Sequence, residues 1–72
     1  MTDGVTYVNP TPGAASNIKA VANGFYQVCL YKNGSEMKIM LAKDQATAEA
    51  VMALESMQLI FDEQNVIVGI AP

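Results

Sequence analysis

The chain has 72 residues, of which 51% are hydrophobic and only 15% are charged, and its formal net charge is −3. A chain of this length forms one domain with a small core, and a low charged fraction predicts apolar surface that a partner or a second copy covers. The basic residues are four lysines without arginine or histidine. This composition argues against the basic surfaces with which proteins bind nucleic acid or anionic membranes.

The N-terminal stretch is interpreted as an arm over residues 1–17, followed by a single α+β domain over residues 18–72. Residues 5–8 have the composition of a short edge strand. Pro10 and Pro12 lack the backbone N–H that a strand ladder needs, so pairing is expected to stop there. The arm is therefore predicted to be partly flexible or to contribute one short edge strand.

The stretch before Phe25 admits two interpretations. In the first, it is a strand that turns at Asn23 and Gly24, with Ala22 opposite Phe25. In the second, it is a short helix over residues 16–22 that the same Asn-Gly pair caps. We favour the strand, because it extends the following hairpin into a three-stranded meander.

A β-hairpin around Asn33 and Gly34 is the strongest local signal of the sequence. A two-residue type I′ turn needs positive φ at both central positions, which Asn and Gly tolerate best. Centring the turn on this pair places Val28 opposite Ile39 and divides the side chains between two faces. The inner face is predicted to contain Tyr26, Val28, Leu30, Met37, Ile39 and Leu41. The open face is predicted to contain Phe25, Gln27, Cys29, Tyr31, Glu36, Lys38, Met40 and Ala42.

The second half of the chain predicts one helix and one further strand. A helix is expected over residues 44–58, with Asp44 as its N-cap. Residues 59–61 fit either the end of this helix or the start of a strand. The β-branched run over residues 65–70 predicts a buried C-terminal strand. The apolar stripe of the helix is expected to consist of Thr47, Ala50, Val51, Leu54, Met57 and Phe61.

These elements together predict an α+β fold. It is a small antiparallel β-meander built on Asn-Gly hairpins, with one helix packed on one face and a C-terminal strand completing the sheet.

The chemistry of the sequence argues against an enzyme. Without histidine there is no imidazole base or metal ligand, and Cys29 lies within a strand without a basic neighbour to activate it. We predict no catalytic residue, no metal site and no cofactor. A single cysteine fits a reducing compartment, and no signal-peptide pattern or membrane-spanning run is evident, so we expect a cytoplasmic protein without membrane attachment.

The leading hypothesis is a non-enzymatic protein-binding module that uses the open sheet face. Its partner is another protein or a second copy of the chain, as in a homodimer; the alternative is that the N-terminal arm covers this face. Small size and acidic composition are typical of accessory or inhibitory proteins of phages and mobile elements. Two other hypotheses are a self-assembling structural subunit and a nucleic-acid-binding module, although the charge disfavours nucleic acid; in the latter Tyr26, Tyr31 or Phe25 stacks on bases. The predicted partner-binding residues are Phe25, Gln27, Tyr31, Glu36, Lys38 and Met40.

Overall fold

The computed structural model describes residues 1–13 and 18–72, and these form a mixed seven-stranded sheet with one α-helix. The predicted α+β class is confirmed. The elements in chain order are β1 (Tyr7–Val8), β2 (Ile18–Ala20), the 3₁₀ turn η2 (Ala22–Gly24), β3 (Tyr26–Lys32), β4 (Glu36–Ala42), α1 (Gln45–Met52), β5 (Ser56–Met57), β6 (Leu59–Phe61) and β7 (Ile67–Ile70).

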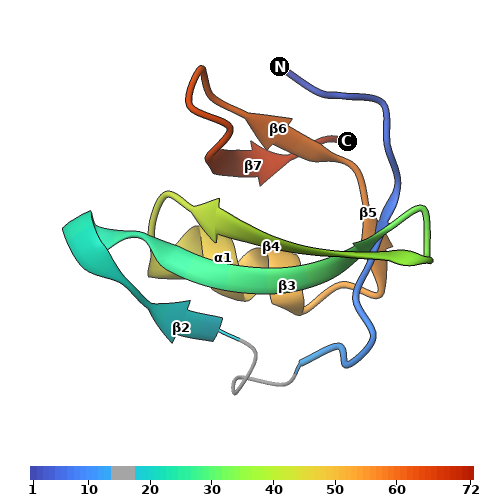
Figure 1. Cartoon of the computed structure of the whole chain (residues 1–72), viewed down its shortest axis with the longest axis horizontal. Coiled ribbons are helices and arrows are strands. Elements are labelled where there is room, and N and C mark those ends of the chain that lie inside the picture. Colours follow the sequence, from blue (N-terminus) through green and yellow to red (C-terminus); the bar gives the residue numbers. More distant parts are fainter. Residues whose placement is uncertain (14–17) are drawn as a thin grey trace.

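The strands follow the spatial order β5-β1-β3-β4-β7-β6, and β2 pairs with the half of β3 that β1 leaves free. Neighbouring strands are antiparallel except β4 and β7, which run parallel and meet at a single register pair, Ala42 with Ile67. The β6–β7 hairpin therefore touches β4 at one end and lies apart from it elsewhere (Figure 1).

The N-terminal segment closes the sheet into a small barrel. β1 pairs with β5, and Thr2 forms an antiparallel bridge with Ile60 of β6. The backbones of Met1 and Phe61 exchange two hydrogen bonds of 3.1 and 2.8 Å. β5 and β6, the two ends of the strand order, follow each other in the chain. The N-terminal segment pairs with both of them and so closes the sheet (Figure 1).

The connectivity is that of a five-stranded Greek-key barrel. The barrel strands are the N-terminal segment, β3, β4, the β5–β6 stretch and β7. The helix stands between the third and fourth of these strands, and the third and fifth run parallel. The barrel is open where β4 and β7 diverge, as in the partly open Greek-key barrels called OB-folds.

The helix α1 is capped as predicted but ends earlier than predicted. The Asp44 carboxylate accepts a hydrogen bond of 2.8 Å from the backbone N–H of Thr47. The helix ends at Met52 rather than at residue 58, because the chain must turn to pair β5 with β1. The buried residues of the helix are Ala48, Val51 and Met52. Of these, the predicted apolar stripe contains only Val51.

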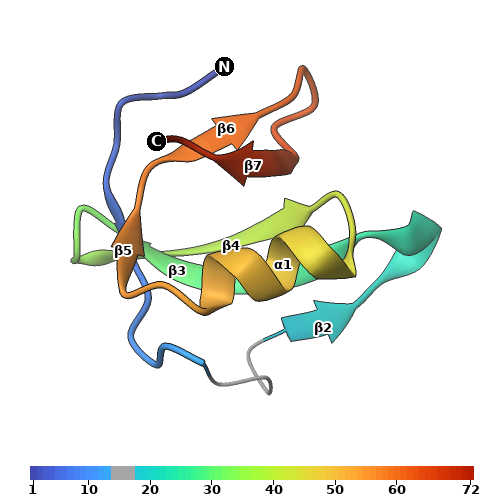
Figure 2. The same cartoon turned by 180° about the vertical axis from the view of Figure 1, so that it is seen from behind.

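The helix covers the interior side of β3 and β4 and also packs against β2 and β7 (Figure 2). The core formed between these layers contains Tyr7, Val28, Leu30, Ala42, Ala48, Val51, Met52, Met57, Leu59 and Ile67.

The predicted register of the central hairpin is wrong by one residue. Asn33 and Gly34 both have positive φ, and the N–H of Ser35 donates to the carbonyl of Lys32 at 3.1 Å, as a type I′ turn requires. The ladder, however, resumes with Lys32 opposite Glu36, so three residues rather than two join the strands. One extra residue reverses the face of every side chain in β4.

The observed register places small or flexible side chains of β4 inside. Val28 lies opposite Met40, while Ile39 lies opposite Cys29 on the outer side and is 60% exposed. Ala42 is fully buried where β4 meets β7. A larger side chain at that point would keep the two backbones apart, which explains why Ala42 rather than Leu41 faces the interior.

The hairpin of β2 and β3 shows the same one-residue shift. The strand interpretation is confirmed for residues 18–20, whereas residues 16 and 17 of the alternative helix lie outside the described part of the chain. The ladder pairs Lys19 with Gln27 rather than with Val28. The shift therefore moves the Lys19 side chain from the interior to the exposed side.

The N-terminal arm is built into the core rather than laid over the open face. β1 has β3 on one side and β5 on the other, so it is not an edge strand. Tyr7 is only 4% exposed. Asn9 is 2% exposed, its amide donates to the carbonyl of Met52 at 2.7 Å, and its backbone N–H donates to the carbonyl of Glu55 at 2.8 Å. These contacts fix the arm against the end of α1.

The register makes a direct prediction about stability. Leu30→Ala removes a fully buried side chain and should lower the free energy of unfolding by about 2–5 kcal/mol, a large part of what so small a domain has. Ile39→Ala removes an exposed side chain and should change it by less than about 0.5 kcal/mol. Urea unfolding of both variants tests this, and a loss of similar size at Ile39 would contradict the observed register.

Candidate functional site

The open surface of the molecule lies on the outward side of β3 and β4. We call it the outer sheet face and define it as Gln27, Cys29 and Tyr31 of β3 with Met37, Ile39 and Leu41 of β4. Ile39 and Met37 are 60% and 58% exposed, although both are large apolar side chains. The other members are half-buried, and none of the six carries a carboxylate or an amino group.

The structure divides the predicted partner-binding residues between two sides of the sheet. Gln27 and Tyr31 belong to the outer sheet face, and Phe25 lies half-buried directly before β3. The β4 residues Glu36, Lys38 and Met40 lie on the opposite side, because the register differs by one from the predicted one.

The three displaced residues have structural surroundings of their own. Met40 packs against the core. Lys38 and Glu36 form an ion pair of 2.9 Å. The hydrogen bond from Lys38 lowers the pKa of the Glu36 carboxyl, with a further contribution from the positive charge of Lys38.

The sequence predicts Met37 and Ile39 in the core, because a two-residue turn at Asn33 and Gly34 would place them opposite the apolar residues Leu30 and Val28. The competing alternation in β4 is Lys38, Met40 and Ala42, which is less apolar but fits the interior. Only the small size of Ala42 hinted at the correct side. A fully buried alanine is favoured where two backbones approach closely, and the sequence alone does not reveal that approach.

The edge of β4 beside the outer sheet face lacks a strand neighbour over most of its length. β4 meets β7 at Ala42, and the N–H of Lys43 donates to the carbonyl of Ile67 at 2.9 Å. Among the described residues, no strand pairs with the β7-facing edge of β4 over residues 36–41. This stretch therefore presents backbone donors and acceptors to an incoming strand.

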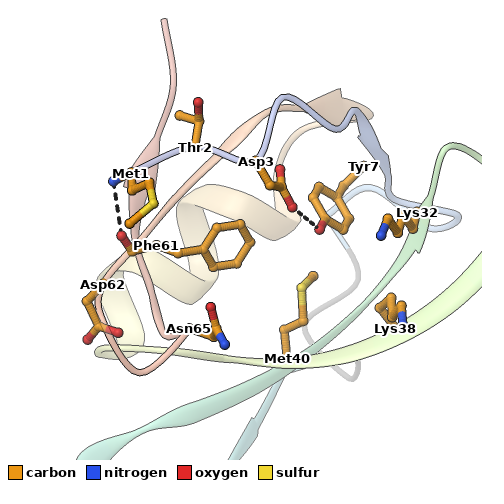
Figure 3. A pocket seen from close by; sticks show the side chains of 10 residues that line it. All are labelled: Met1, Thr2, Asp3, Tyr7, Lys32, Lys38, Met40, Phe61, Asp62 and Asn65. Carbon is orange, nitrogen blue, oxygen red and sulfur yellow. Dashed lines mark hydrogen bonds between the residues drawn. The ribbon is translucent and has the colours of Figure 1, made fainter.

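A pocket of about 420 Å³ lies on the inner side of β4, between this strand and the N-terminal segment. Figure 3 shows Lys32 and Lys38 at one end of the pocket and Asp62 at the other. The Phe61 ring meets the Tyr7 ring edge to face, with 6.3 Å between the ring centroids. The lining residues are Met1, Thr2, Asp3, Tyr7, Lys32, Lys38, Met40, Phe61, Asp62 and Asn65.

Tyr7 and Asp3 form the shortest side-chain hydrogen bond of the pocket wall, with 2.7 Å between the hydroxyl and the carboxylate (Figure 3). Burial, together with this hydrogen bond, raises the pKa of Tyr7 to about 12. Burial alone would raise the pKa of Asp3, but the hydrogen bonds from the Tyr7 hydroxyl and the Val5 N–H outweigh it and lower that pKa. Asp3 is therefore ionised and occupied by protein donors at neutral pH.

The described residues contain no group of three or more His, Cys, Asp or Glu side chains arranged to hold a metal ion. In the same part of the chain, no helix has the length and apolar character needed to cross a membrane. Comparison with protein-family models, curated proteins and solved structures gives no match for this chain. The assignment of function consequently depends on the two surfaces of the β3–β4 ribbon.

The Tyr7–Asp3 contact predicts an unusual titration. Because folding favours the neutral hydroxyl, Tyr7 adds stability that is complete below pH 10 and is lost as the pH rises through about 12. Tyrosinate absorbance should therefore show one component near pH 12 that disappears in Tyr7→Phe. Tyr31→Phe is the control and should retain that component. If the component near pH 12 persisted in Tyr7→Phe, it could not belong to Tyr7.

Proposed function

We propose that the protein is a non-enzymatic protein-binding module and that its partner covers the outer sheet face. The observation that carries this proposal is the exposure of Ile39 and Met37 next to Tyr31 on one uncharged surface. Aromatic and methionine side chains without central charges are typical of the buried part of protein interfaces. The hydrophobic gain from covering such residues is roughly 25 cal/mol per Å² of apolar surface.

The free edge of β4 supports a specific mode of binding. A partner strand that pairs with residues 36–41 would satisfy the backbone groups that β7 leaves unpaired. Side chains of the partner that flank this paired strand would then lie over Met37 and Ile39. In this mode backbone pairing contributes affinity, and the side chains on the outer sheet face select the partner.

The proposal is tested by placing a charge on the outer sheet face. Ile39→Glu should abolish binding of the partner, because a carboxylate buried at an apolar interface has no counter-charge there. The melting temperature should remain nearly unchanged, since the side chain is exposed in the isolated domain. Ala50→Glu is the matched control, because Ala50 is exposed on the helix away from this face.

The partner for this test is identified by photo-crosslinking. A photoreactive phenylalanine analogue at position 39 should form one dominant crosslinked species, whereas the same analogue at position 50 should not. Sedimentation velocity of the purified protein shows whether that species is a second copy of the chain. Equal capture by Ile39→Glu and by Ala50→Glu would exclude the outer sheet face as the contact.

Single-stranded nucleic acid is a second candidate ligand, and the barrel connectivity favours it. Partly open Greek-key barrels of the OB type bind oligonucleotides on the face of their second and third strands, which correspond here to β3 and β4. This is an analogy of fold. Tyr31 is available for stacking on this face, and Lys19 of β2 lies on its border. Tyr26 is not available, because it packs against the core.

A salt titration distinguishes this candidate. If the ligand is nucleic acid, the anisotropy of a labelled oligothymidine should rise on adding protein at low salt, and the affinity should fall steeply as salt increases. Tyr31→Ala should weaken binding by about 1–3 kcal/mol, the usual contribution of one stacked base. Absence of binding at low salt would eliminate nucleic acid and leave the protein partner.

A further inference from the structure

The pocket on the inner side of β4 exists because the barrel is not closed there. β4 and β7 separate beyond the pair Ala42–Ile67, so among the described residues no strand pairs with the β7-facing edge of β4 at Met40 and Lys38. The N-terminal segment and β6 form the opposite wall through the bridge between Thr2 and Ile60. The resulting volume of about 420 Å³ lies within the range of small-molecule sites.

The middle of the pocket is apolar. The rings of Tyr7 and Phe61 form one wall and the Met40 side chain another, as Figure 3 shows. Methionine has an unbranched, polarizable side chain that adapts to ligands of different shape. These surfaces fit the hydrophobic body of a small molecule.

The negative charges of the pocket wall are already engaged by protein donors. Asp62 accepts hydrogen bonds of 2.8 and 2.9 Å from the backbone N–H groups of Gln64 and Val66. Asp3 accepts 3.0 Å and 2.7 Å hydrogen bonds from the backbone N–H of Val5 and the hydroxyl of Tyr7. Both carboxylates are therefore held in place by the fold.

The two lysines of the pocket wall differ in whether their ammonium groups are paired. Lys38 is paired with Glu36 at 2.9 Å. The ammonium group of Lys32 forms neither a hydrogen bond nor an ion pair within the described part of the chain, and it acts on Asp3 and Glu36 only through space. Among the charged side chains of the described pocket lining, that of Lys32, a half-buried residue, is thus the one without a contacting partner.

We propose that this pocket binds a small monocarboxylate with a hydrophobic body. The carboxylate pairs with the ammonium group of Lys32, and the body contacts Phe61 and Met40. A ligand with several negative charges is disfavoured, because Lys38 is paired with Glu36, the Met1 ammonium group donates to the Phe61 carbonyl, and Asp3 lies nearby. The site is separate from the outer sheet face, since Lys32 and Met40 occupy the inner side of the same two strands.

The test uses two acids, octanoate and indole-3-acetate, each with its neutral analogue, 1-octanol or indole-3-acetamide. Each ligand is titrated into the full chain, and NMR signals of the methionine methyl groups and aromatic rings are followed. At least one of the two acids should shift the Met40 and Phe61 signals in a saturable way. Its neutral analogue should bind about tenfold or more weakly, as expected when a charge-assisted hydrogen bond is lost.

Charge-removing variants then identify the cation. Lys32→Gln should weaken binding of that acid about tenfold and abolish its advantage over the neutral analogue. Lys19→Gln removes the same charge outside the pocket and should leave the affinity unchanged. Neither variant should alter thermal unfolding, because the side chain of neither lysine forms a hydrogen bond or an ion pair with the described residues.

Four results would overturn the proposal. The first is the absence of saturable shifts at Met40 and Phe61 with both acids. The second is equal binding of the acids and their neutral analogues. The third is an equal loss of affinity in Lys32→Gln and Lys19→Gln. Shifts centred on Ile39 would also overturn it, because they would place the ligand on the outer sheet face.

Discussion

The arrangement of this protein depends on one extra residue after the Asn33-Gly34 turn. The turn itself has the backbone conformation that Asn and Gly favour, with positive φ at both residues. Ser35 then stands outside the ladder, and Lys32 pairs with Glu36. This single residue decides that Ala42 is buried at the contact with β7 and that Ile39 is exposed. Both candidate binding surfaces follow from it.

The second constraint is the closure of the sheet by contacts between distant parts of the chain. The first residues reach β6, and β1 lies between β3 and β5. The buried amide of Asn9 ties this segment to the end of α1 through the Met52 carbonyl. A buried polar group without a partner would cost about 1–3 kcal/mol, so this hydrogen bond fixes the path of the arm. A domain with a small core gains stability by making its termini part of the sheet.

The sequence predicted those features that depend on local chemistry. Asp44 is predicted as a helix cap because good helix formers follow it, and its carboxylate does accept from the Thr47 N–H. Both Asn-Gly pairs lie in turns as predicted, although each loop is one residue longer than predicted. Features that depend on distant contacts were not predicted. The end of α1 at Met52 is imposed by pairing of β5 with β1, and the position of the arm is imposed by β3 and β5.

The candidate site was half correct for the same reason. β3 was assigned to the correct sides, because Val28 and Leu30 are its most apolar alternating residues. In β4 two alternations competed, and the more apolar one, which includes Met37 and Ile39, turned out to be the exposed one. Local hydrophobicity favours the wrong side here, because the interior near β4 contains a pocket and a close backbone contact rather than a uniform apolar core.

The alternation of side chains along β3 and β4 also keeps the two proposed sites chemically distinct. On these two strands the inward side carries Lys32, Lys38 and the flexible Met40, and the outward side is uncharged. A partner that pairs with the free edge of β4 would lie close to the mouth of the pocket, because this edge exists only where β4 leaves β7. The two sites would therefore affect each other through the separation of β4 and β7 rather than through shared side chains. A ligand that favours one separation of these strands would change the affinity for the partner, and the partner would change the affinity for the ligand by the same factor.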